Sequence, residues 1–334
     1  MQITRDTRFD VVGIGNAIVD VIAKAEASFL SRHNIVKGAM TLIDEAEATR
    51  LYEHMSAGRE TSGGSAANTI AGIAALGGKA AFIGKLRNDQ WGEVFAHDIR
   101  AGGVHFTTSF ATQGPATARC LILVTDDAQR SMNTYLGASQ HLSAADIDRD
   151  IIASSAVTYL EGYLWDPPTA KEAFRLAARL AHESGRKIAF TLSDPFCVER
   201  YRDDFRALVR DEVDILFANE VEITALYQTN SFQEALEKAA KDCPLVALTR
   251  SEKGCVVATP QGIETVPAEA GVKVVDTTGA GDLFAAGFLY GLTRNAPMND
   301  CARMGVLAAS EIISHFGARP EADLKTLFRK KGVA

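Results

Sequence analysis

Apolar residues in this chain gather in short runs and in helix-spaced stripes that follow one another in turn. The run at 11–15 has the length and the β-branched content of a buried strand. Between 169 and 184 apolar residues recur every three or four positions, which is the spacing of an amphipathic helix. Gly185 follows that stripe as a helix stop. The pattern therefore predicts alternating strands and helices over most of the chain.

Read along the whole chain, the pattern gives two sets of elements and a fold class. Strands are expected at 11–15, 19–23, 80–84, 157–160, 188–192, 215–218, 246–249 and 272–275, with a hairpin at 255–258 and 263–266. Helices are expected at 66–76, 91–101, 169–184, 283–292 and 303–313. Repeated strand–helix units imply a mostly parallel central sheet with helices on both faces, an α/β three-layer sandwich.

Two segments do not fit this layered pattern. Residues 17–43 mix short polar and apolar stretches, and residues 106–137 alternate and are rich in β-branched residues. Open α/β sheets bind ligands at the carboxyl ends of their strands. We expect the two segments to form a small β-sheet lid over those ends, inserted in a single domain that spans 1–334.

Composition excludes several classes of function. The chain has 334 residues, 47% of them hydrophobic, and a net charge of -7 without a basic block, so no nucleic-acid partner is expected. No apolar run approaches the ~20 residues that cross a bilayer, and residues 1–6 lack the apolar core of a signal peptide. The five cysteines form no metal or redox motif, which favours free thiols in the cytoplasm.

The segment 276–282, Asp-Thr-Thr-Gly-Ala-Gly-Asp, carries the strongest chemical signal. It follows an apolar run and opens an apolar helix, so unpaired backbone N–H groups at the helix start can bind an anion. Gly279 and Gly281 permit the close approach that a phosphate needs. Asp282 adds a carboxylate beside that site, which suggests a base in phosphoryl transfer. The simpler interpretation, a helix cap with an acidic first turn, is less consistent with two glycines and no bulky residue.

Polar residues also follow other predicted elements. Asp20 has two acceptor oxygens suited to neighbouring sugar hydroxyls, although a solvated turn aspartate explains the local sequence better. Gly63 and Gly64 open a helix, and Asn68 lies one turn inside it, where it can donate to and accept from a hydroxyl group. Tyr163 follows a strand end and can either stack on a base or pack in the core.

A third group suits a nucleotide. Asn219 and Glu222 have the spacing of a capping box, and the same pair can hold Mg²⁺ through water; both interpretations can hold together. Thr249 ends a strand and Gly254 follows in a loop that can border a base or ribose. No Walker-type phosphate loop is present. The dinucleotide fingerprint at 13–18 is weak because Ile18 occupies the place of its third glycine.

Taken together, the segments 63–68, 219–222 and 276–282 resemble those of the ribokinase-like (PfkB) carbohydrate kinases. The resemblance runs from residue 11 to about residue 320, and 276–282 closely matches the second signature of that family. Within the family the adenosine kinases are most similar. That likeness rests on Asn16 with Asp20 and on the segments 191–196 and 213–220.

The resemblance implies a role for each candidate residue. Asp282 activates the acceptor hydroxyl, and Gly279, Ala280 and Gly281 stabilise the transferring phosphoryl group. The acceptor is held by Asn16, Asp20, Gly63, Gly64, Asn68 and Tyr163, and ATP lies beside Asn219, Thr249, Gly254 and Thr277. The metal positions are Glu222, which contacts Mg²⁺ through water, and Asp276 with Thr278, which match the site of a monovalent cation such as K⁺.

The sequence therefore predicts an ATP-dependent kinase that converts adenosine to AMP and acts as a monomer or homodimer. Ala66-Ala67 and Ser251 depart from the family pattern and bear on substrate choice and nucleotide fit. The alternatives of the same chemistry are a kinase of inosine or guanosine and a kinase of a free sugar such as ribose or fructose. Those of other classes are an NAD-dependent oxidoreductase and a non-catalytic nucleoside-binding protein.

Overall fold

The computed structural model describes residues 3, 6–127 and 129–333. Part of the segment 1–6, in which we expect no signal peptide, lies outside the described residues. A large sheet forms the centre of the molecule, in the order β14-β13-β12-β11-β10-β9-β1-β5-β6. Its parallel strands are β1 (Phe9–Ile14), β5 (Ala80–Ile83), β6 (His105–Phe106), β9 (Ser155–Glu161), β10 (Lys187–Thr191), β11 (Ile215–Asn219) and β12 (Leu245–Thr249). The hairpin of β13 (Cys255–Thr259) and β14 (Gly262–Val266) continues it in the antiparallel sense. The predicted α/β class with a mostly parallel sheet is confirmed.

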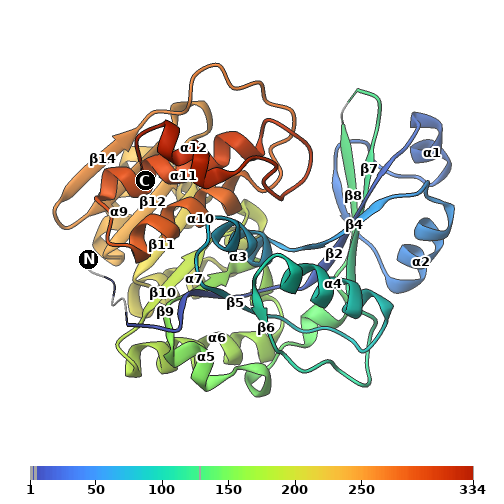
Figure 1. Ribbon diagram of the computed structural model, residues 1–334, viewed down its shortest axis with the longest axis horizontal. Helices are drawn as coiled ribbons and strands as arrows, with labels where there is room; N and C mark the ends of the chain where they lie inside the picture. Colours follow the sequence, from blue (N-terminus) through green and yellow to red (C-terminus); the bar gives the residue numbers. More distant parts are fainter. Residues whose placement is uncertain (1–2, 4–5, 128, 334) are drawn as a thin grey trace.

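Helices cover both faces of this sheet, as Figure 1 shows. On one face lie α3 (Ser65–Ala75), α4 (Gln90–Ala101), α10 (Ala280–Thr293), α11 (Met298–Ile312) and α12 (Leu324–Lys330). On the other lie α5 (Arg149–Ala153), α6 (Pro168–Glu183), α7 (Pro195–Asp211), α8 (Glu220–Tyr227) and α9 (Phe232–Asp242). Successive residues of β1 point to opposite faces, so Val11 packs in one buried cluster and Val12 in the other. These two clusters are the core of the molecule.

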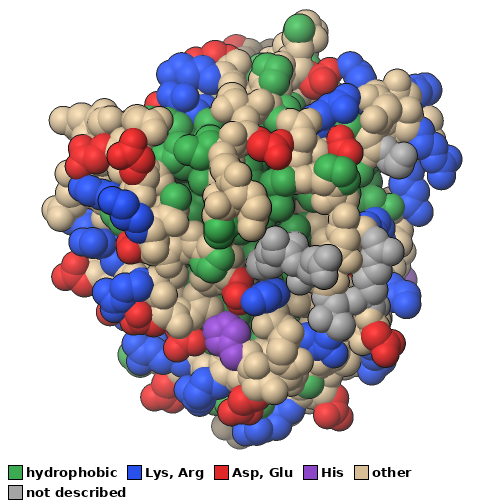
Figure 2. Space-filling model, turned by 90° about the vertical axis from the view of Figure 1, so that its left-hand side faces the viewer, with side chains coloured by type: hydrophobic (Ala, Val, Ile, Leu, Met, Phe, Trp, Pro, Cys, Tyr) green, Lys and Arg blue, Asp and Glu red, His purple; other side chains and the backbone are tan. Residues whose placement is uncertain are grey.

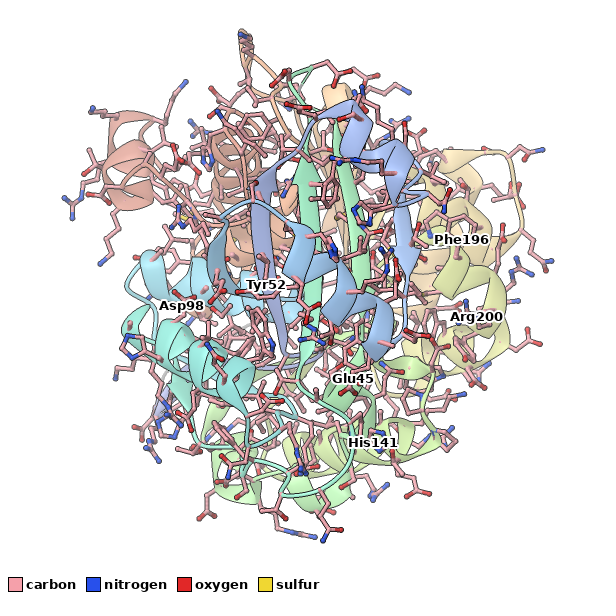
Figure 3. All side chains as sticks on the ribbon, turned by 90° about the vertical axis from the view of Figure 1, so that its right-hand side faces the viewer. Glu45, Tyr52, Asp98, His141, Phe196 and Arg200 are labelled. Atoms are coloured by element: carbon pink, nitrogen blue, oxygen red, sulfur yellow. The ribbon has the colours of Figure 1, made fainter. Side chains whose placement is uncertain are left out.

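A second, smaller sheet lies beside the large one, on the right of Figure 1. Its order is β3-β8-β7-β2-β4, with β2 (Ile18–Lys24), β3 (Met40–Leu42), β4 (Arg59–Gly63), β7 (Ala118–Val124) and β8 (Arg130–Tyr135). Two helices, α1 (Ala27–Arg32) and α2 (Glu45–His54), lie across its outer face in Figure 3, where Glu45 and Tyr52 mark α2. The sequence pattern predicted neither β4 nor α2.

The strand predicted at 272–275 does not form, because none of the strands in the described part of the chain lies beside this run. The backbone N–H groups of Val275 and Asp276 both donate to the carbonyl oxygen of Ile313, just past the end of α11. Val274 is 59% exposed. The segment that leads to the glycine turn is therefore a loop tied to the end of α11.

The surface agrees with a protein of mixed charge. Figure 2 looks onto the side of the molecule where β14 forms the sheet edge, and acidic and basic side chains are interspersed there. In the described part of the chain, no helix is both long enough and apolar enough to cross a bilayer. All five cysteines are free thiols, four of them buried, as predicted.

Candidate active site

The amino ends of α3 and α10 meet beside the carboxyl ends of the large sheet. The hydroxyl group of Ser65, the first residue of α3, donates to Oδ1 of Asp282 at 2.7 Å. The two helices cross closely at Gly72, where an added Cβ would lie 2.8 Å from the Cβ of Ala286. Both helix dipoles therefore direct their positive ends into one space.

The first turn of α10 leaves three amides free. Gly279, the residue before the helix, has a φ of +78°, which glycine adopts without strain. Within the described residues, the N–H groups of Gly279, Gly281 and Asp282 have no hydrogen-bond acceptor, whereas that of Ala280 donates to the carbonyl oxygen of Thr277 at 3.2 Å. An added Cβ on Gly281 would meet nothing within 4 Å, so the space in front of this residue is open. The turn can accept an anion through three amides, which do not include that of Ala280.

Asp282 is held in this turn and remains partly exposed to solvent. Its Oδ1 accepts from Ser65 and its Oδ2 accepts from Nδ2 of Asn68 at 3.1 Å. Burial raises the pKa of Asp282 to about 6, against the opposing effects of these two hydrogen bonds and of the Arg319 charge. At neutral pH this carboxylate is ionised and still basic enough to take a proton.

A second carboxylate, Asp20, lies near the first. β2 pairs with β4, and an added Cβ on Gly63 would lie 2.3 Å from Oδ2 of Asp20, so only glycine leaves room for this side chain. The next residue, Gly64, has a φ of +99° and caps α3. Burial raises the pKa of Asp20 to about 6; Arg319 and Arg130 oppose the rise, and Asp282 adds to it. The charge of Asp282 therefore helps to raise the pKa of Asp20.

Asn16 is buried and its polar atoms are engaged. Its backbone N–H and its Nδ2 both donate to Oε1 of Glu161 at 2.7 Å, and Gln140 donates to its Oδ1 at 3.3 Å. Glu161 is fully buried, and its Oε2 accepts from the backbone N–H of Ala66 at 2.6 Å. This glutamate, which the sequence reasoning missed, joins the turn after β1 to the start of α3. Its one signal in the sequence was an acidic residue directly after an apolar strand.

Two arginines also reach the site, and neither was predicted. Arg319 donates from Nη1 to Oδ1 of Asn68 at 2.9 Å and from Nη2 to the carbonyl oxygen of Ser62 at 2.5 Å. Arg130, on β8, forms a buried ion pair with Asp276. Its Nε and Nη2 are buried and have no partner within the described residues.

Asp276 is surrounded by hydrogen-bond donors. Its Oδ1 accepts from the N–H of Thr278 at 3.0 Å, and its Oδ2 accepts from the N–H of Gly317 at 3.1 Å and from Arg130. A guanidinium group and two amides thus occupy the carboxylate. This arrangement does not fit a monovalent cation held by Asp276 and Thr278.

The residues expected beside a nucleotide lie at the ends of β11 and β12. Asn219 and Glu222 form both halves of a capping box, and Asn219 pairs in register with Thr249. Glu222 is buried, and burial raises its pKa to about 7. Gly254 has a φ of +85°, and an added Cβ would lie 2.0 Å from the carbonyl oxygen of Val266, so the hairpin itself requires glycine there. Among the described residues, no three His, Cys, Asp or Glu side chains form a metal-binding group.

Tyr163 lies in the short helical turn Gly162–Trp165 that follows β9. It is 38% exposed, and its backbone N–H donates to the hydroxyl oxygen of Ser193 at 3.2 Å. Burial, followed by the charges of Asp194, Asp282 and Glu222 among others, raises the pKa of its phenol. The predicted acceptor residues and the predicted catalytic turn therefore come together, and the charges of Asp282 and Glu222 both act on Tyr163. Thr277 is exposed at the edge of the turn.

Comparisons with known proteins agree with this geometry. The chain is 53% identical to the solved adenosine kinase from Sinorhizobium meliloti, with a TM-score of 0.89 over 97% of this chain and 100% of that one. It is 51% identical to a probable sugar kinase protein from Rhizobium etli CFN 42, with a TM-score of 0.90 over 98% and 100% of the two chains. The adenosine kinase of Saccharomyces cerevisiae is 27% identical over 92% of this chain and 95% of its own length. Residues 11–325 match the model of the pfkB family carbohydrate kinases. The chain therefore belongs to that family and is a phosphotransferase that acts on a hydroxyl group.

Proposed function

We propose that this protein transfers the γ-phosphoryl group of ATP to the 5′-hydroxyl group of adenosine, which gives AMP and ADP. The observation that carries the proposal is the turn at 279–282, where a carboxylate of raised pKa lies beside three amides that have no acceptor among the described residues. The likeness to the adenosine kinase of Sinorhizobium meliloti supports a nucleoside as acceptor.

The acceptor lies between the small sheet and the start of α3. Asp20 accepts hydrogen bonds from ribose hydroxyl groups, and the bare backbone at Gly63 and Gly64 lets the sugar approach closely. Asn68 is already hydrogen-bonded to Asp282 and Arg319, so it mainly orients the carboxylate of Asp282. One N–H of its side-chain amide remains for the sugar. Tyr163 offers a partly exposed ring for the nucleobase.

The reaction is an in-line displacement. Asp282 takes the proton of the 5′-hydroxyl group. The hydroxyl oxygen forms a bond to the γ-phosphorus atom while the bond between that atom and the bridging oxygen of ADP breaks. The amides of Gly279, Gly281 and Asp282 stabilise the charge that develops on the phosphoryl oxygens. Arg130 adds positive charge from the small sheet, and its Nε and Nη2 have no partner in the described part of the chain. In this proposal the small sheet acts as the lid that excludes water.

Mg²⁺ fits this site only as a companion of ATP. The carboxylate of Glu222 is bonded inside its capping box, and the described residues offer no cage of three acidic or histidine ligands. Mg²⁺ keeps several of its own waters and is bound largely through nucleotide phosphates, where it neutralises their charge. Asn219 and Glu222 would then contact that water shell.

A free sugar is the second candidate acceptor. The probable sugar kinase protein from Rhizobium etli, at 51% identity, favours it, and the carboxylate of Asp20 suits the hydroxyl groups of either acceptor. Inosine and guanosine share the ribose as well.

The test is a panel of adenosine, inosine, guanosine, ribose and fructose with ATP and Mg²⁺, in which ADP release is measured. We expect adenosine to give the highest kcat/KM. A free sugar that exceeds adenosine would overturn the choice of acceptor and keep the chemistry. Tight adenosine binding without ADP release would reduce the protein to a nucleoside-binding module.

A further inference from the structure

We propose that Arg319 is the positioning residue of this site: it fixes the side-chain amide of Asn68 so that the amide N–H faces the carboxylate of Asp282. The inference rests on the proposed function, because it assigns Asp282 the role of base. Arg319 lies after α11, in the segment 317–320, far along the chain from every residue that it contacts.

A continuous series of hydrogen bonds joins Arg319 to Asp282. At its outer end, Oδ2 of Asp98 on α4 accepts from the backbone N–H of Ser62 at 2.8 Å and from its hydroxyl group at 2.6 Å. Arg319 donates to the hydroxyl oxygen and to the carbonyl oxygen of Ser62, at 2.9 and 2.5 Å. It also donates to Oδ1 of Asn68, whose Nδ2 donates to Asp282. The series runs through α4, β4, α3 and α10, so it fixes four elements relative to one another.

The chemistry of the partners allows one orientation of the amide. A guanidinium group can only donate, so the oxygen of Asn68 must face Arg319. The NH₂ group of Asn68 must then face Asp282, and the ionised carboxylate can only accept. Without Arg319 the amide can turn over and present its oxygen to the carboxylate, which repels it. Arg319 therefore selects the orientation that favours the ionised base.

Arg319 also supplies charge to a site that holds several acids. Asp98, Asp20 and Asp282 face it from α4, β2 and α10. Asp282 lies near Asp20, and its charge also acts on three further groups, Glu161, Tyr159 and Tyr163. The other cation that acts on Asp20 is Arg130. Of these groups, Arg319 alone both donates to Asn68 and opposes protonation of Asp282.

The test compares Arg319→Gln and Arg319→Lys with the unmodified enzyme over a series of pH values. Gln removes the charge and Lys keeps it, but a single ammonium group lacks the planar fork that reaches both Asn68 and Ser62. The quantity measured is kcat/KM for the acceptor that the substrate panel identifies. Arg329→Gln, a change of the same kind on the exposed face of α12, is the matched control.

We expect Arg319→Gln to move the acid limb of the kcat/KM pH profile to higher pH by about one unit, so that kcat/KM falls about fivefold near pH 6 and recovers near pH 9. In Arg319→Lys the acid limb of the pH profile should stay at the same pH, and kcat should fall about fivefold at every pH. The inference would be overturned if the acid limb of the pH profile did not shift in Arg319→Gln. It would also be overturned if the kcat of Arg319→Lys equalled that of the unmodified enzyme, and this second result decides alone if Arg319→Gln does not fold. Lack of ADP release by the unmodified enzyme with every acceptor would instead sink the proposed function.

Discussion

Asp282→Asn should nearly abolish activity and at the same time stabilise the fold. A general base contributes on the order of 10²–10⁴-fold to the rate, so kcat should fall at least about 100-fold. The fold should tolerate the change. The amide oxygen can accept from Asn68, whose orientation Arg319 fixes, while the new NH₂ group donates to the hydroxyl oxygen of Ser65.

The gain in stability follows from the raised pKa. Burial moves the pKa of Asp282 from 3.8 to about 6, so folding disfavours the ionised form. That shift corresponds to about 3 kcal/mol at neutral pH, which partial exposure to solvent reduces to about 2 kcal/mol. For a chain of this length 2 kcal/mol raises Tm by about 3 °C. The gain should be full above about pH 6 and should vanish below about pH 4, where the carboxyl group is protonated in both the folded and the unfolded chain.

Two assays check this prediction. ADP release in the presence of adenosine gives kcat, and thermal unfolding followed by circular dichroism gives Tm near pH 7.5 and near pH 4. Asp150→Asn is the matched control, because Asp150 also lies in a first helical turn but is exposed. A near-normal kcat in Asp282→Asn would refute the assignment of the base. A lower Tm at neutral pH would refute the electrostatic reasoning, whatever the rate.

Two more predictions concern the turn and the arginine of the small sheet. Gly279→Ala should lower the free energy of unfolding by about 1–2 kcal/mol and reduce kcat, because Gly279 has a φ of +78° and an added Cβ would lie 3.0 Å from that of Ala318. Gly281→Ala is its control: it should unfold like the unmodified protein, because the added Cβ meets open space, and equal Tm values for the two variants would contradict the argument. Arg130→Met should raise the KM for ATP by about tenfold or more, because it removes donors from the phosphate side and leaves Asp276 without its ion-pair partner. An unchanged KM for ATP in steady-state kinetics would remove Arg130 from the nucleotide site.

Local signals in the sequence predicted the large sheet and the turn at 276–282. Hydrophobic period and glycine stops placed α6 and β10 within a residue of their observed bounds. The capping box at Asn219 and Glu222 formed as its spacing predicted. The turn at 276–282 was recognisable because the free amides of a helix start are a property of the local backbone.

Elements and contacts that depend on distant partners could not be predicted. β4, with the sequence Arg-Glu-Thr-Ser-Gly, has no strand pattern and forms because β2 offers it a free edge. The apolar run at 272–275 has such a pattern but no partner, so it stays a loop. Arg319 lies 251 positions from Asn68 and Glu161 lies 145 from Asn16, and nothing in the local sequence announces either contact.

The small sheet carries two charged groups that reach the candidate site. Asp20 on β2 and Arg130 on β8 lie on its inner face and are joined through β7. Asp20 lies beside Gly63 and near Asp282, and Arg130 contacts Asp276 in the turn at 276–282. We propose that acceptor binding at Asp20 holds the sheet closed and so keeps Arg130 at the phosphates. ATP hydrolysis without acceptor should then be at least about 100-fold slower than phosphoryl transfer, and a comparable rate of phosphate release without adenosine would contradict this coupling.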